Sequence, residues 1–205
     1  MNMPLTKPTL RDRRAAVGRE AVLDALVAHL ESGDVDAVSM EDLAREAGVS
    51  RRTLYRYFPT RSDLLAAASD HVRGRVLDID PAIATGGIAA SFRAGVTRSA
   101  ARPQLARALL ATESGRAVRG GFRKARVDAI RADVRTLAPH LSKREVERAA
   151  AVLAYLCSLN AWVSLQDESG LTPDRAEEAV LWAIELIQQN LQQNVQSDRR
   201  KATSR

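Results

Sequence analysis

Apolar residues recur at helical spacing along most of this chain, and that periodicity predicts an all-α fold. No stretch alternates apolar and polar residues for long enough to indicate a β-strand. A first helix is predicted over residues 13–31, with Val22, Leu26 and Leu30 along one side. Residues 77–87 interrupt the pattern with a proline and two adjacent glycines, so we expect the domain boundary there.

The segment 39–58 predicts two short helices joined by a tight turn. Ser39 can cap the first of them, with Asp42 in the answering position of a capping box. Gly48 supplies the left-handed residue that ends this helix, and Ser50 can cap the next one. This is the layout of a helix-turn-helix, in which the N-terminal residues of the second helix face base edges in the DNA major groove.

The second helix of this motif carries side chains suited to DNA. Arg51 and Arg52 lie in its first turn, where two positive charges oppose the helix dipole, so local stability does not explain them. An arginine at that place can bond to guanine or to a phosphate. Thr53 is short enough to let the helix approach closely. Tyr55 and Tyr57 can pack in the groove and donate to phosphates, although Tyr55 can equally be a partly buried core residue.

Further basic residues flank these positions. Arg56 lies between the two tyrosines, where it can bind DNA or simply be solvated. Arg61 falls in the first turn of the next helix, predicted from Thr60, where the backbone amides favour an anion. Before the first helix, Arg11 and its neighbours form a basic arm that can reach the DNA minor groove or be a tail without a role.

The distribution of charge fits a protein that contacts phosphates at particular places. The chain of 205 residues has a formal net charge of +6. Basic residues predominate over residues 7–19 and 45–61, whereas residues 20–42 hold seven acids and neither lysine nor arginine. An ordinary solvated surface can produce the same blocks, because runs of charge are common on the helices of soluble proteins.

Composition excludes several other classes. The single cysteine, Cys157, rules out an internal disulfide and fits a reducing cytoplasm. No stretch approaches the ~18–20 apolar residues of a membrane span. Residues 1–14 lack the apolar core of a secretion signal, so we expect a cytoplasmic protein. The three histidines are scattered and no side chains stand at catalytic spacing, which predicts no metal, no cofactor and no enzymatic activity.

Beyond the boundary the periodicity predicts five more helices. They are expected near residues 88–101, 103–113, 117–137, 142–166 and 172–195. The last two have apolar residues on two sides, whereas a surface helix needs only one. A symmetry mate can cover the second side, and so can a wide core within the chain. For a homodimer, the expected interface residues are Leu153, Cys157, Ile184, Ile187 and Leu191.

With these residues in view, residues 13–70 resemble the TetR family of transcriptional regulators. The resemblance rests above all on Ala47-Gly-Val-Ser50 followed by Thr53-Leu-Tyr55 and Tyr57-Phe58. It implies a repressor that a small molecule releases from a palindromic operator in double-stranded DNA. It also implies a dimer whose last two helices form a four-helix bundle with their mates. By position, the DNA contacts would fall on Ser39, Arg51, Arg52, Thr53, Tyr55, Tyr57 and Arg61.

This resemblance and the patterns together divide the chain. We expect a flexible basic arm (1–12), a three-helix helix-turn-helix domain (13–58), a connecting helix and linker (59–80), a helical ligand-binding and dimerisation domain (81–196) and a disordered basic tail (197–205).

The sequence does not identify a ligand. The expected pocket residues are Phe92, Leu109, Leu110, Glu113, Phe122, Tyr155 and Trp162. The apolar members of this set can equally be plain core, since most buried apolar residues serve packing. The helix over residues 117–137 is rich in arginine, which fits an anionic effector or merely a solvated basic face. Two other hypotheses stay open: a DNA-binding protein without a ligand, and an enzyme of unknown reaction.

Overall fold

The structure is a computed structural model that describes residues 9–76 and 87–203, and every regular element within these residues is a helix. In chain order the elements are α1 (Leu10–Ser32), α2 (Met40–Glu46), α3 (Arg51–Tyr57), α4 (Arg61–His71), the π-helical turn η1 (Val72–Val76), α5 (Gly87–Ala100), α6 (Pro103–Ala111), α7 (Glu113–Leu137), α8 (Lys143–Leu156), α9 (Leu159–Ser169) and α10 (Pro173–Thr203). The predicted all-α fold is confirmed. The predicted boundary lies, except for Gly87, outside the described residues.

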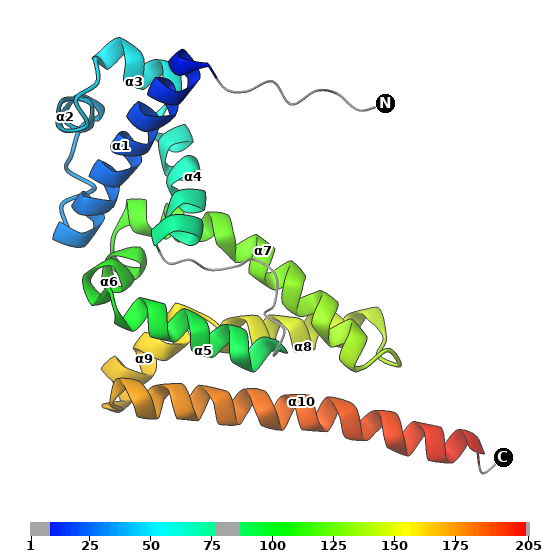
Figure 1. Ribbon diagram of the computed structural model, residues 1–205. Helices are drawn as coiled ribbons and strands as arrows, with labels where there is room; N and C mark the ends of the chain where they lie inside the picture. Colours follow the sequence, from blue (N-terminus) through cyan, green and yellow to red (C-terminus); the bar gives the residue numbers. More distant parts are fainter. Residues whose placement is uncertain (1–8, 77–86, 204–205) are drawn as a thin grey trace, which may run out of the picture.

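The helices gather at two ends of an elongated molecule (Figure 1). Helices α1, α2 and α3 form one end, and α10 lies along the other. Two contacts join the ends, because α4 packs against α7 and α1 packs against α6. A change in the tilt of α7 would therefore also move α4, which packs against it.

Two clusters of buried apolar side chains divide the chain by packing. The first is built from α1 to α4 and continues into α6 and the start of α7, where Leu105, Leu109 and Val118 join it. The second is built from α5, the remainder of α7, α8, α9 and α10, with Ile130 and Leu153 among its members. Helix α6 and the start of α7 therefore follow the linker in sequence, yet they pack on the helix-turn-helix.

Local capping explains where the helices of the motif begin and end. Ser39 and Asp42 form the predicted capping box at α2. Ser50 caps α3, since its hydroxyl accepts from the amide of Thr53 at 3.1 Å. Gly48 follows α2 with a φ of 66°, a conformation that glycine adopts without strain. The turn between α2 and α3 is thus set by residues whose roles were predicted.

Helices α1 and α10 extend beyond their predicted ends. Helix α1 starts at Leu10 because Thr9 and Asp12 form a complete capping box, so residues 10–12 do not belong to a flexible arm. Helix α10 continues to Thr203, where a disordered tail was expected from residue 197. Neither glycine nor proline follows Pro173, so nothing in the sequence interrupts that helix.

One segment that was predicted as a single helix forms two helices in the structure. The segment expected as a single helix over residues 142–166 bends by 58° between α8 and α9. Ser158 causes the break by capping α9, because its hydroxyl accepts from the amide of Ala161 at 3.2 Å. No single described helix is long and apolar enough to cross a membrane, and α8 with α9 pass that test only as a bent pair, by length and composition.

The residues predicted for a dimer interface differ in how deeply they are buried within the single chain. Leu153 and Ile184 are completely buried in the second core, and Leu191 is also buried there. Cys157 and Ile187 are half-buried and pack against the same cluster. The prediction is wrong for Leu153 and Ile184, because α8 packs on α7 and α10 packs on α5 and α9 of the same chain. For Cys157, Ile187 and Leu191, which keep part of their surface accessible, it stays a prediction.

The thiol of Cys157 lies in this core, and burial raises its pKa to about 12. The thiolate is the reactive form of cysteine. We therefore expect the folded protein to react with a chromogenic disulfide reagent at mildly alkaline pH far more slowly than the same chain in urea. Absorbance of the released thiolate measures both rates, and equal rates would contradict the burial of this side chain.

A second expected result concerns the contact between α4 and α7. A Cβ atom added at Gly121 would lie 2.3 Å from Oγ of Ser69, whereas one added at Gly120 would meet nothing within 4 Å. Gly121→Ala should therefore lower the free energy of unfolding by about 1–3 kcal/mol through overpacking. Gly120→Ala is the matched control and should raise it by up to about 1 kcal/mol, because alanine favours helix. Urea titration of both variants checks this, and equal effects would contradict the close approach of the two helices.

Candidate nucleic-acid interface

Helix α3 is anchored on one side and open on the other. Leu54 is fully buried, and Phe58, directly after the helix, is 1% exposed. Arg51, Arg52 and Arg56 are exposed. Because the two apolar side chains fix the rotation of the helix, the three arginines are held on its solvent side.

Arg51 is oriented by other residues of the motif. Its Nε lies 3.0 Å from Oε1 of Glu41 on α2, and its Cζ lies 5.6 Å from the centroid of the Tyr55 ring. The hydroxyl of Tyr55 donates to the same Glu41 oxygen at 3.3 Å. Tyr55 is 36% exposed, so its ring stays accessible while it supports the arginine. The predicted pair is therefore placed side by side at the surface.

Arg52 differs from Arg51 because it makes no hydrogen bond or ion pair to any residue that the structure describes. Unlike Arg51, it therefore breaks no hydrogen bond or ion pair within the described part of the chain when it binds a base or a phosphate. Thr53 follows it, half-buried, with its Oγ1 at 2.8 Å from Oγ of Ser50. At the start of α3, the guanidinium group of Arg51 is thus held by an ion pair, and that of Arg52 has no partner among the described residues.

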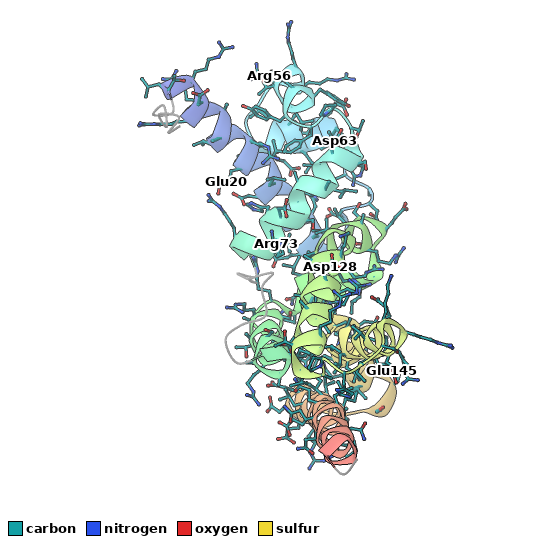
Figure 2. The ribbon with its side chains drawn as sticks, turned by 90° about the vertical axis from the view of Figure 1, so that its right-hand side faces the viewer. Glu20, Arg56, Asp63, Arg73, Asp128 and Glu145 are labelled. Carbon is teal, nitrogen blue, oxygen red and sulfur yellow. The ribbon has the colours of Figure 1, made fainter. Side chains whose placement is uncertain are left out.

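The other end of α3 lies against α1. A Cβ atom at Gly18 of α1 would come within 3.3 Å of the Tyr57 hydroxyl, and the Arg56 guanidinium lies 5.5 Å from the centroid of the Tyr57 ring. A surface hollow between the two helices is lined by Arg11 and Arg14 of α1 together with these two residues. Figure 2 shows Arg56 at the end of the molecule remote from α10.

Sequence reasoning placed Arg11 in a basic arm and did not include Arg11 or Arg14 among the residues expected to contact DNA by position. They stand instead in the first two turns of α1, beside α3. The pattern Thr9-x-x-Asp12 is the capping signal that would have found them. The hollow is lined by three guanidinium groups and one carboxylate, that of Asp12. The excess of positive charge suits a phosphate oxygen, which accepts charge-assisted hydrogen bonds.

Two predicted contacts have other partners. The Ser39 hydroxyl donates to Oδ2 of Asp42 at 2.6 Å within the capping box. Arg61 points away from α3, since it donates to the carbonyl oxygens of Val35 and Val38 and, at 3.3 Å, to Oγ of Ser114 on α7. Arg61 therefore ties the loop before α2 to α7, and the structure does not support its predicted phosphate contact.

Asp36 completes this joint between the two ends of the molecule. Its carboxylate accepts from the amides of Glu113 at 2.8 Å and Ser114 at 2.9 Å, at the N-terminus of α7. Hydrogen bonding from the Ser114 side chain chiefly, and then from the amides of Ser114 and Glu113, lowers the pKa of Asp36. The carboxylate thus stays ionised and serves as a cap for α7 that is supplied by the helix-turn-helix loop.

The acids over residues 20–42 make such contacts, although several of them also keep much of their side chain exposed. Each of the seven acids has a partner, and most of the partners lie on another element. The partners are Arg75 for Glu20, His71 for Asp24, Arg102 for Glu31, His29 for Asp34, the α7 amides for Asp36, Arg51 for Glu41 and Ser39 for Asp42.

The predicted pocket residues do not line one cavity. Leu109 is buried in the first core and Phe122 packs against it, whereas Phe92 and Trp162 belong to the second core. Tyr155 is 58% exposed. Glu113 is exposed too and Leu110 is half-buried. Among the described residues, no group of three or more histidine, cysteine or carboxylate side chains is placed to hold a metal ion.

Comparison with known proteins identifies the helix-turn-helix end. Residues 22–68 match the family described as bacterial regulatory proteins, tetR family. The chain is 40% identical over 68 residues to the transcriptional repressor LfrR of Mycolicibacterium smegmatis, covering 33% of this chain and 35% of that protein. It is 33% identical over 72 residues to the nucleoid occlusion factor SlmA of Haemophilus influenzae, covering 34% and 33% of the two. The match thus spans about a third of each curated relative.

The likeness in fold extends over most of the chain. A TetR transcriptional regulator from Rhodococcus sp. RHA1 superimposes with a TM-score of 0.53 over 85% of this chain and 97% of its own, at 17% identity. At that identity the comparison shows a shared fold. Because 85% of the chain is covered, the shared fold includes helices that follow residue 86.

Proposed function

We propose that this chain, whose amino-terminal domain belongs to the tetR family of bacterial regulatory proteins, is a homodimeric transcriptional regulator that binds double-stranded DNA through α3. Its natural role is that of a repressor released by a small molecule, working in the cytoplasm where the DNA lies. The observation that carries the proposal is the start of α3, where exposed Arg51 and Arg52 stand on a helix anchored by Leu54 and Phe58.

The second copy of the chain is expected to bind at α8 and α10. These helices contact each other, and each keeps two large apolar side chains exposed. They are Val152, Tyr155, Trp182 and Leu186. Solvent-exposed apolar patches mark interfaces, and a symmetric pair is the commonest assembly of soluble proteins. Helix α10 lies at the end of the molecule opposite α3 (Figure 1), so a dimer built there keeps both copies of α3 free.

The proposed release from DNA is a shift between two conformers of this dimer. An effector that favours one tilt of α7 moves the helix-turn-helix through Asp36 and Arg61, which hold its loop to the N-terminus of α7. The π-helical turn η1, directly after α4, is a place where the winding can change. Only a difference in affinity for the two conformers drives such a shift, and typical coupling is ~1–3 kcal/mol.

An alternative is a DNA-binding protein without an effector. The curated relatives matched over the same domain include both a repressor and a nucleoid occlusion factor, so the helix-turn-helix by itself does not specify what the rest of the chain senses. This alternative predicts an affinity for DNA that no small molecule changes.

Selection of bound duplexes from a random pool tests the proposed function. The expected result is a palindrome whose half-sites lie about one helical turn, ~34–36 Å, apart or slightly more. A pool that shows no enrichment at low salt would overturn the proposal. Enrichment of one unrepeated half-site would keep DNA binding and overturn the dimer.

A further inference from the structure

Two arginines on α7 have a buried polar atom without a partner. The Nε atoms of Arg119 and Arg126 are inaccessible to solvent and make no hydrogen bond, and neither side chain forms an ion pair within the described part of the chain. They are seven residues apart, so they lie on one face of the helix about 10 Å from each other. Buried polar groups are almost always hydrogen-bonded, so each such exception needs an explanation.

Their position along α7 is the seam between the two cores. Val118 and Phe122 pack in the first cluster, and Val127 and Ile130 pack in the second. Both side chains are half-buried, although their Nε atoms are fully covered. Apolar side chains stand on either side of them along the helix.

The described part of the chain offers no counter-charge at this seam. Burial chiefly, and also the like charges of Arg119 and Arg123, lower the pKa of Arg126, yet an arginine stays protonated at neutral pH. Among the described residues, the one group that acts to raise the pKa of Arg126 is Cys157, which would do so as a thiolate. Burial raises the pKa of that thiol to about 12, so it is neutral at physiological pH.

The nearby carboxylates are engaged or too distant. Asp128 and Glu147 both pair with Arg131. Asp133 is seven residues beyond Arg126, about 10 Å further along the helix, and burial raises its pKa, which disfavours its charged form. The positive charge of the two arginines is thus left uncompensated by the described residues. An uncompensated buried charge costs stability, which is expected of a site that binds an anion.

We propose that Arg119 and Arg126 bind the carboxylate of an amphipathic organic acid whose apolar part lies at the seam between the two cores. This inference rests on the proposed function, since it identifies the chemical class of the effector. A carboxylate matches the fork of a guanidinium group with parallel charge-assisted hydrogen bonds. The bound acid would favour one tilt of α7. Because Asp36 holds the N-terminus of α7 to the helix-turn-helix, that tilt would change the spacing between the two copies of α3 in the dimer.

The test is calorimetric titration of the purified full chain with decanoate and phenylacetate, and with decanamide and phenylacetamide as neutral analogues. The wild type is expected to bind one of the acids and neither amide. Arg126→Gln and Arg119→Gln should each weaken binding of the acid by roughly tenfold or more, the effect of losing a hydrogen bond to a charged group. Arg123→Gln is the matched control, because Arg123 is exposed on the same helix; it should change binding by about twofold or less.

A second readout does not depend on the ligand. Arg126→Met removes the uncompensated charge, so the melting temperature of the unliganded protein should rise or stay constant, and Arg123→Met should leave it unchanged. A fall in melting temperature with Arg126→Met alone would indicate a structural role and overturn the inference. If Arg126→Gln does not fold, the proposal is tested by acid binding to Arg119→Gln and by the melting temperature of Arg126→Met.

Several outcomes overturn the proposal. They are failure of both acids to bind the wild type, equal binding of acid and amide, equal binding of inorganic phosphate, and unchanged affinity in both glutamine variants. The wild type is titrated in parallel with the DNA selected from the random pool. If it binds DNA but no acid, this inference alone fails. If it enriches no DNA, the proposed function fails whatever the acids do.

Discussion

Replacing Trp182 by glutamate should convert the protein to a monomer and weaken its binding to a palindromic duplex by roughly a hundredfold or more, because the second half-site no longer benefits from tethering. Trp182 is 65% exposed in the single chain, so the substitution should change the stability of the protomer by no more than about 0.5 kcal/mol. In a symmetric dimer the glutamates of both copies would be buried without a partner, which is strongly unfavourable.

Sedimentation equilibrium measures the oligomeric state, and titration of the labelled duplex measures the affinity. Ala132→Glu is the control, since it adds the same charge at an exposed position on α7; it should remain dimeric with unchanged affinity. A dimeric Trp182→Glu variant would show that the copies meet at another surface.

Replacing Arg52 by alanine should weaken binding to the selected duplex by about 1–3 kcal/mol. Its side chain makes no bond to any described residue, so the fold should not change. If Arg52 neutralises a phosphate, the slope of log affinity against log salt should also become shallower, by about one unit for each phosphate that the variant leaves unneutralised. If it reads a guanine, discrimination at one base pair of each half-site should fall.

Arg144→Ala provides a close control. Arg52 and Arg144 both occupy the second position of a helix capped by serine, and both are exposed. Arg144 lies in the first turn of α8, in the part of the chain that we place away from the DNA. Fluorescence anisotropy should show no decrease in affinity for that variant, and equal decreases for the two would mean that net charge rather than α3 determines binding.

The helix-turn-helix could be predicted residue by residue because its signals are local. The capping roles of Ser39, Ser50 and Gly48 need only their near neighbours. The burial of Leu54 and Phe58 follows from helical periodicity. Arg51 and Arg52 were predicted to contact DNA because nothing in the local chemistry explained two cations at a helix N-terminus.

The remaining contacts depend on elements that are distant in sequence. Arg61 has the spacing of a phosphate ligand, but Ser114, more than fifty residues later, accepts from it instead. Leu153 and Ile184 have the pattern of an interface, and only the packing of α8 on α7 and of α10 on α5 and α9 shows them to be core. The apolar pattern of a helix shows that it has a buried side, but it does not show which chain covers that side.

Methylation interference on the selected duplex tests most directly the claim that α3 enters the major groove as one of a symmetric pair. Methylation of guanine N7 blocks a major-groove acceptor. We predict interference at two dyad-related positions about one helical turn apart, with the effect at one guanine of each half-site abolished in Arg51→Ala or Arg52→Ala. Binding that is indifferent to guanine N7 methylation throughout the duplex, or that is blocked on one side alone, would contradict the account.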